Sequence, residues 1–236
     1  MYVLGIESAT PVASVAVTGE EGILAERMVR NGRTHSVNLL PMIKAVIAEA
    51  EITRDDLSGI AVSAGPGSFT GLRIGMSIAK TLAQIWGLPI VGVSTLEGLA
   101  HALLGHKDLV CPILNARKNE VYTAVYDYSG STESLLLPHR AAKAWELIEI
   151  LAPWRRPVTF LGDGVPIFRE QLWAGLGDLA AFAPFTHTHP RGAAIAELGR
   201  SALAKGRGVD PLELQPEYIR FSEAEVLWQK KQNAGG

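Results

Sequence analysis

The chain has 236 residues, of which 47% are hydrophobic, and a formal net charge of −2. This length allows one large domain or two small ones, and the charge balance excludes a broad basic surface that would grip nucleic acid unaided. A single cysteine excludes a disulfide within the chain. No apolar run reaches the roughly 20 residues of a membrane-spanning helix, so we expect a cytoplasmic protein without a membrane segment.

The first half of the chain predicts the element order β-β-β-α-β-α-β. Short turns join the first three strands, a spacing typical of an antiparallel meander. The predicted elements are strands at Tyr2–Ser8, Ala13–Thr18 and Ile23–Val29, a helix at His35–Ala50, a strand at Ile60–Ala64, a long helix that ends at Trp86, and a strand at Pro89–Ser94.

The second half repeats this order less regularly. The predicted elements are strands at Leu109–Ala116, Glu120–Asp127 and Ser134–Leu137, a helix at Ala141–Leu151, a strand at Val158–Leu161, and helices at Val165–Trp173 and Pro190–Lys205. Two β-β-β-α-β-α units in one chain predict duplicated lobes that face a cleft.

This α/β architecture is typical of the actin, Hsp70 and sugar-kinase (ASKHA, ribonuclease-H-like) superfamily. We place the N-terminal lobe at residues 1–104, joined by the C-terminal segment 206–236, and the C-terminal lobe at residues 105–205. The sequence leaves open whether residues 221–236 form a helix on the first lobe or a tail.

The long helix carries two apolar faces, although a helix on a sheet needs only one. Ile74, Ile78, Leu82 and Ile85 share one face, and Leu72, Met76, Ala79, Ala83 and Trp86 share the other. Either the helix at 35–50 covers the second face, or both helices offer a docking surface to another protein. The predicted docking residues are Leu39, Ile43, Val46, Ile47, Leu72, Arg73, Met76, Ala79, Lys80 and Ala83.

Two glycine turns suggest a place for a nucleotide. The turn Gly65-Pro-Gly-Ser-Phe-Thr-Gly71 lies between a strand and a helix N-terminus, where free N–H groups favour anions. Gly162-Asp-Gly164 takes the equivalent place in the second lobe. Each turn can also be a structural turn without a ligand. The candidate nucleotide-binding residues are Glu7, Gly65, Gly67, Ser68, Gly71, Gly162, Asp163 and Gly164.

Metal-binding and catalytic residues are harder to find. Glu7 ends the first strand, where a carboxylate can hold a metal-bound water, or it is an ordinary strand end. Asn115 at the matching strand end is uncharged, which makes a magnesium site weak. Neither the histidine spacing nor Cys111 predicts a metal centre or a nucleophile, so we assign no catalytic and no metal-binding residues.

Five segments carry a resemblance to a known family, the bacterial TsaB (YeaZ) family. They are Ile6-Glu-Ser-Ala-Thr10, Gly65-Pro-Gly-Ser-Phe-Thr-Gly-Leu-Arg-Ile-Gly75, Gly92-Val-Ser-Thr-Leu96, Asn115-Ala-Arg-Lys-Asn-Glu-Val-Tyr122 and Pro216-Glu-Tyr-Ile-Arg220. The chain departs from many members at Glu7 and Asn115, where they have Asp.

The resemblance implies a non-catalytic subunit that works with TsaD and TsaE. Together these proteins place threonylcarbamoyl on the adenosine next to the anticodon of tRNAs that read ANN codons. The resemblance further implies docking to TsaD through the two N-lobe helices, a homodimer through the same face when alone, and contact with tRNA through the complex. ATP or ADP, if bound at all, is expected in the complex.

The sequence agrees with an inactive role at one motif. The catalytic sister pattern Gly-Val-x-His-x-x-x-His has two metal-binding histidines one helical turn apart, and here Thr95 and Leu99 take their places. The alternative is an autonomous ATP- or metal-dependent transferase or metallopeptidase of the same superfamily, which would need bound metal or turnover. A third possibility is nucleotide binding without catalysis.

Overall fold

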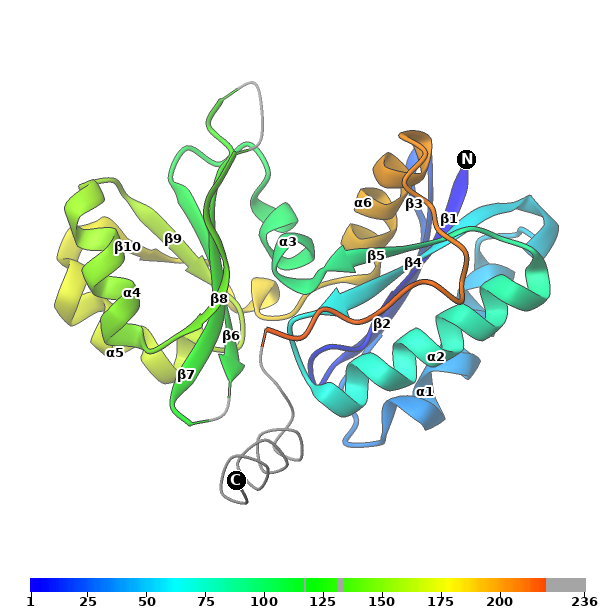
Figure 1. The fold of residues 1–236 in the computed structure, drawn as a ribbon, viewed down its shortest axis with the longest axis horizontal. Coiled ribbons are helices and arrows are strands. Elements are labelled where there is room, and N and C mark those ends of the chain that lie inside the picture. The colour runs from blue at the N-terminus through cyan, green and yellow to red at the C-terminus, as the bar shows by residue number, and fades with distance from the viewer. Residues whose placement is uncertain (117, 131–133, 220–236) are drawn as a thin grey trace, which may run out of the picture.

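The molecule has two lobes, each built on a five-stranded mixed sheet (Figure 1). The computed structural model describes residues 1–116, 118–130 and 134–219. The first sheet has the strand order β3-β2-β1-β4-β5, and the second has the order β10-β9-β6-β7-β8. The matching orders show the duplicated α/β architecture that the sequence predicts.

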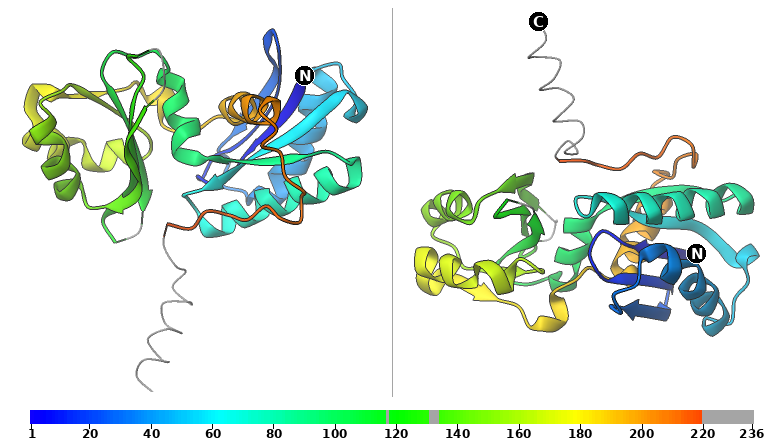
Figure 2. Two further views of the ribbon diagram at one scale, coloured as in Figure 1. Left: turned by 45° about the horizontal axis from the view of Figure 1, so that its top comes forward. Right: turned by 90° about the horizontal axis from the view of Figure 1, so that it is seen from below.

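The first sheet is covered by helices on both faces. Its elements are β1 (Tyr2–Glu7), β2 (Ala13–Gly19), β3 (Gly22–Val29), α1 (His35–Glu49), β4 (Leu57–Gly65), α2 (Phe69–Trp86) and β5 (Ile90–Ser94), together with α6 (Gly192–Ala204). Helices α1 and α2 lie on one face, and α6 lies on the other (Figures 1 and 2). Successive side chains of β1 point to opposite faces of the sheet. Leu4 and Ile6 therefore pack toward α2, whereas Val3 packs toward α6.

The second sheet is enclosed in the same way. Its elements are β6 (Leu109–Ala116), β7 (Glu120–Asp127), β8 (Ser134–Ala142), α4 (Ala144–Leu151), β9 (Val158–Leu161), α5 (Val165–Leu176) and β10 (Ala180–Phe182), and α3 (Thr95–Ala100) connects the lobes. Helices α4 and α5 cover one face, while α3 packs against the other through Leu96 and Leu99. The core of the second lobe therefore extends into the junction between the lobes.

Most predicted elements are present, with differences at their ends. Strand β8 continues to Ala142, so α4 begins at Ala144 and not at residue 141. Helix α3 and strand β10 were not predicted, since each has six residues or fewer and shows too little periodicity. The question of residues 221–236 lies outside the described residues.

Helix α6 packs on the first sheet, although the sequence analysis placed it with the second lobe. Small residues on both sides allow the close approach: a Cβ on Gly5 would lie 2.2 Å from the Gly192 carbonyl oxygen, and one on Gly199 would lie 2.2 Å from Ala61 Cβ. The first lobe therefore consists of the N-terminal part of the chain and residues 192–204. Among the described residues, no helix is long and apolar enough to span a bilayer.

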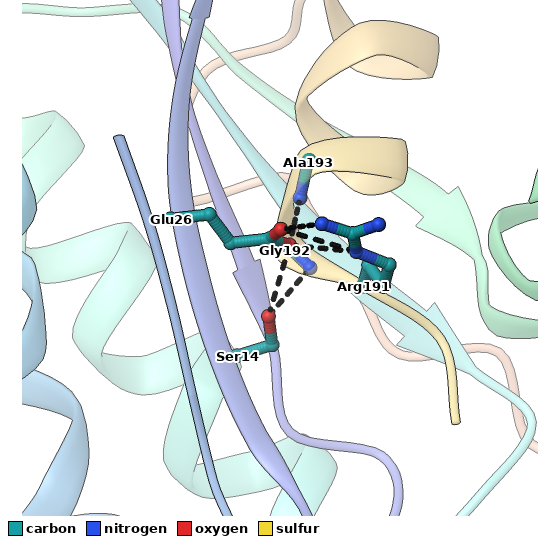
Figure 3. Close-up of polar contacts among 5 residues, drawn as sticks. All are labelled: Ser14, Glu26, Arg191, Gly192 and Ala193. Carbon is teal, nitrogen blue, oxygen red and sulfur yellow. Dashed lines mark hydrogen bonds and ion pairs between the residues drawn. The ribbon is translucent and has the colours of Figure 1, made fainter. Parts of the chain in front are cut away.

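Two side chains of the first sheet bind the start of α6 (Figure 3). Gly192 N–H donates to Ser14 Oγ at 2.8 Å, and Ala193 N–H donates to Glu26 Oε1 at 3.1 Å. Arg191 donates from its Nε to Glu26 Oε2 at 3.1 Å. The negative charge of Glu26 lies at the positive end of the helix dipole, so this contact both caps α6 and holds it on the sheet.

Candidate functional site

The first glycine turn is packed against the chain's own backbone. A Cβ on Gly67 would lie 2.5 Å from the Ala9 carbonyl oxygen, and one on Gly71 would lie 2.1 Å from the Ser8 carbonyl oxygen. Ser68 N–H donates to the Ala9 carbonyl at 2.7 Å, and the Ser68 hydroxyl accepts from Gly71 N–H at 3.2 Å. Close packing and hydrogen bonds within the chain thus explain why Gly67, Ser68 and Gly71 are at these positions, without a bound phosphate.

Gly65 has both a special conformation and a close neighbour. Its φ is +121°, a region in which a side chain is strained. A Cβ there would also lie 2.3 Å from the Glu217 carbonyl oxygen. The Glu217 N–H donates to the Ala64 carbonyl at 2.7 Å, so the C-terminal segment lies directly over the turn.

Glu7 is fully buried beside this turn. Its Oε1 accepts a hydrogen bond from Ala9 N–H at 2.6 Å, and its Oε2 has no partner among the described residues. Burial raises the pKa of Glu7 to about 8, against the opposing effect of the hydrogen bonds from Ala9 and Ser63. The expected role of Glu7 in holding a metal-bound water stays a prediction.

The second glycine turn has the same self-contained character. Gly162 has a φ of +114°, and a Cβ there would lie 2.2 Å from the Ile113 carbonyl oxygen. Gly164 N–H donates to the same oxygen at 3.0 Å. Asp163 accepts from Asn115 N–H at 2.7 Å, and burial raises its pKa despite that hydrogen bond and the nearby Arg30. A nucleotide held by the two turns stays a prediction.

The helix faces are used differently from the expected docking surface. Most of the predicted residues are buried in the chain's own core: Leu39, Ile43, Val46, Leu72, Met76, Ala79 and Ala83 are at most 5% exposed. On α2 this face lies on the sheet, because its small residues allow close packing; a Cβ on neighbouring Gly75 would lie 2.1 Å from Ser8 Oγ. The proposed contact through Ala79 and Ala83 is therefore corrected.

The outer flank of the same helices carries the exposed apolar side chains. Val37 is 52% exposed, Leu40 is 50% exposed and Ile85 is 68% exposed. Ile74 and Ile78 are half-buried and lie on the same flank of α2 as Ile85 by helical spacing. We call this set, together with the half-buried Ile47 of α1, the α1–α2 face; α1 and α2 lie side by side (Figure 2).

Arg73 and Lys80 hold the chain's own C-terminal segment along the other flank of α2. Lys80 Nζ donates to the carbonyls of Leu212 and Leu214 at 3.3 and 2.9 Å. Arg73 Nε donates to the Tyr218 hydroxyl at 3.1 Å, and the Arg73 guanidinium lies 3.8 Å from the centre of the Phe69 ring. These two residues were predicted to meet a partner, and here they fasten residues 212–218.

A polar network around His139 joins the two lobes next to the C-terminal segment. His139 Nε2 lies 2.9 Å from the Tyr126 hydroxyl and 3.4 Å from Ser94 Oγ. His139 Nδ1 lies 3.6 Å from Glu217 Oε1 in the C-terminal segment. The side chain of His139 thus links β8 to the end of β5 and to the segment on α2, a contact that sequence spacing does not reveal.

Thr95 and Leu99, which the resemblance places at the sister family's histidine positions, are buried. Thr95 and Leu99 are 0% and 1% exposed, and Leu99 packs beside Gly162 at the lobe junction. Within the described ranges, no group of three or more His, Cys, Asp or Glu side chains is placed to hold a metal ion. At the position of the sister motif, this chain therefore has residues that are buried, and Leu99 packs at the junction between the lobes.

The comparisons with known proteins agree with this architecture. The family described as "TsaD: tRNA N6-adenosine threonylcarbamoyltransferase" matches residues 21–228. The tRNA threonylcarbamoyladenosine biosynthesis protein TsaB of Bacillus subtilis (strain 168) is 32% identical over 98% of this chain and 100% of its own length. The chain belongs to the TsaB family.

Further TsaB relatives and solved structures extend this similarity. The TsaB protein of Escherichia coli (strain K12) is 35% identical over 98% of both chains. A Pseudomonas aeruginosa structure titled as similar to peptidase YEAZ has a TM-score of 0.79 at 25% identity, covering 93% of this chain and 99% of that one. A ROK hexokinase from Thermus thermophilus, at 12% identity and a TM-score of 0.52, supports the two-lobe ASKHA-like fold.

Proposed function

We propose that this chain is a non-catalytic subunit in the biosynthesis of tRNA threonylcarbamoyladenosine. The names of its TsaB relatives support a role in this biosynthesis. The match to the TsaD-type family supports a partner of related fold. Thr95 and Leu99 at the expected histidine positions support a subunit without a catalytic metal. In this proposal TsaD is the direct partner, and TsaE and tRNA are reached through the complex.

The α1–α2 face carries the proposal for docking. It presents exposed side chains (Val37, Leu40 and Ile85) next to half-buried isoleucines on two neighbouring helices, where a partner's helices can bury them. The buried residues beneath it pack both helices onto the sheet. The same face supports a homodimer of the lone chain, which would compete with the partner because both use one surface.

The test replaces exposed residues, so the lone chain stays folded. We expect Leu40→Glu and Ile85→Glu each to weaken binding to a TsaD-type partner by at least about tenfold, or about 1.4 kcal/mol, because a carboxylate is placed in an apolar contact. Isothermal titration calorimetry measures the affinity, and light scattering measures the homodimer. Circular dichroism checks that each variant is folded.

Ile167→Glu is the matched control. Ile167 lies on α5 of the second lobe and is 54% exposed, close to the value for Leu40. The proposal requires the control to bind the partner with unchanged affinity. Equal affinities for all three variants and the unaltered chain would show that docking uses another surface.

A further inference from the structure

A cavity of about 190 Å³ opens in the second lobe, away from the α1–α2 face. It lies where the end of β9, the start of α5 and the segment that follows β10 meet. Its walls include the rings of Phe182 and Phe185 and the prolines Pro166 and Pro184, and its ionisable lining residues are Arg169 and His187. The lining therefore combines flat apolar surfaces with groups that carry or can gain positive charge.

Phe185 does not contribute to the protein core. It is 81% exposed, the largest value among the exposed large hydrophobic residues of the described chain. It stands at the start of a single helical turn, Phe185–His187, at the rim of the cavity. A phenyl ring held in water on a short turn has a free aromatic face, which is available for stacking.

Arg169 also lines the cavity, and its guanidinium is stacked on a ring. The guanidinium carbon is 4.4 Å from the centre of the Phe182 ring, and within the described residues Arg169 makes no ion pair. Stacking leaves the N–H groups at the edge of the guanidinium free to donate to an anion. Thr186 Oγ1 and His187 Nδ1 lie 3.0 Å apart, so the other ring nitrogen of His187 is left for a ligand.

The charge around the cavity is cationic. No acidic side chain is among its lining residues. Asp163 follows the lining residue Gly162, but its Oδ1 accepts from Asn115 N–H at 2.7 Å. Burial raises the pKa of Asp163 against an opposing effect of Arg30 from the first lobe, and burial lowers the pKa of His189, to which Arg30 also contributes. A ligand with a planar apolar part and a negative group would match this surface.

We propose that this cavity holds one unpaired nucleotide of RNA, with the base stacked on Phe185 and the phosphate bound by Arg169. Aromatic side chains that stack bases beside a cationic group are the usual means of binding single-stranded nucleic acid. An acidic peptide would meet Arg169 but leave the exposed ring of Phe185 unused. The RNA would be a transfer RNA, and that identity rests on the proposed function.

The experiment measures binding of a transfer RNA anticodon stem-loop by fluorescence anisotropy. The chain is used by itself and together with a TsaD-type partner. Stacking of one base contributes about 1–3 kcal/mol, so Phe185→Ala is expected to weaken binding about 5- to 150-fold in both settings. Phe185→Trp keeps a stacking ring and restores the affinity, and Arg169→Gln lowers the salt dependence of binding by about one phosphate contact.

Trp173→Ala is the control, because Trp173 is a 52% exposed aromatic residue of the same α5 helix that does not line the cavity. Equal RNA affinity for the Phe185→Ala and Trp173→Ala variants would overturn the proposal. Loss of partner binding with unchanged RNA binding by the lone chain would assign Phe185 to a protein interface and would also overturn it. Failure of the docking proposal leaves a different result, because Leu40→Glu then fails to affect assembly while Phe185→Ala still weakens RNA binding.

Discussion

We predict that Glu26, a residue of the edge strand β3 far from α6 in sequence, stabilises helix α6 and its packing on the first sheet. In the Glu26→Ala variant, Ala193 N–H loses a charged acceptor at 3.1 Å and the helix loses a negative charge at its N-terminus. A hydrogen bond to a charged group contributes about 1.5–3 kcal/mol, and a charge at a helix end contributes about 0.3–1 kcal/mol.

The ion pair with Arg191 adds little to this total. The Arg191 side chain is 51% exposed, although that of Glu26 is only 11% exposed, and a pair in contact with solvent contributes about 0–1 kcal/mol. The expected loss for Glu26→Ala is therefore about 2–4 kcal/mol. Glu26→Gln keeps an acceptor for Ala193 N–H, so it should lose less than half as much.

Urea denaturation followed by circular dichroism measures the change in the free energy of unfolding. Hydrogen exchange adds a local measurement, since the amides of α6 should lose protection before those of β6 and β7. Glu49→Ala is the control: Glu49 pairs with Arg27 through the same charge-assisted geometry, but both side chains are nearly half exposed and neither caps a helix. Equal losses of stability for Glu26→Ala and Glu49→Ala would refute the reasoning.

Two further predictions concern buried titratable groups. Burial raises the folded-state pKa of Glu7 to about 8 from an ordinary value of 4.5, so its contribution to stability is complete below pH 4.5 and is lost as the pH rises toward 8, at about 1.4 kcal/mol per pH unit. Glu7→Gln should flatten the pH dependence of urea midpoints between pH 5 and 8; an unchanged slope contradicts the assignment. Burial also raises the pKa of the Cys111 thiol to about 12, so at pH 8 a thiol reagent should label it only in urea, and rapid labelling of the native chain would show that the strand opens.

Periodicity predicted the strands and long helices because each has one clear pattern. The short turns that join β1, β2 and β3 are local signals that do not depend on the rest of the chain. The duplicated element order also predicted the two matching sheets. Boundaries failed where a strand ran directly into a helix, as at β8 and α4.

The candidate sites were harder to predict, because burial decides what a residue can do. Glu7 has the sequence context of an exposed strand end, but it is fully buried and accepts a hydrogen bond from Ala9 N–H. Arg73 and Lys80 were expected to face a partner, whereas residues 212–218 occupy them. Phe185 and His139 were not singled out, since an exposed ring and a link between the lobes leave no periodic signal.

The sequence by itself determined the number and order of the main elements, the family and the absence of histidines at the sister motif. Only the tertiary structure decided which apolar face of α2 lies on the sheet and which lobe receives α6. The physical reason is the same in both cases. Hydrophobicity alone does not choose between the faces or the lobes, and the choice depends on how closely small residues such as Gly5, Gly75 and Gly199 let two backbones approach.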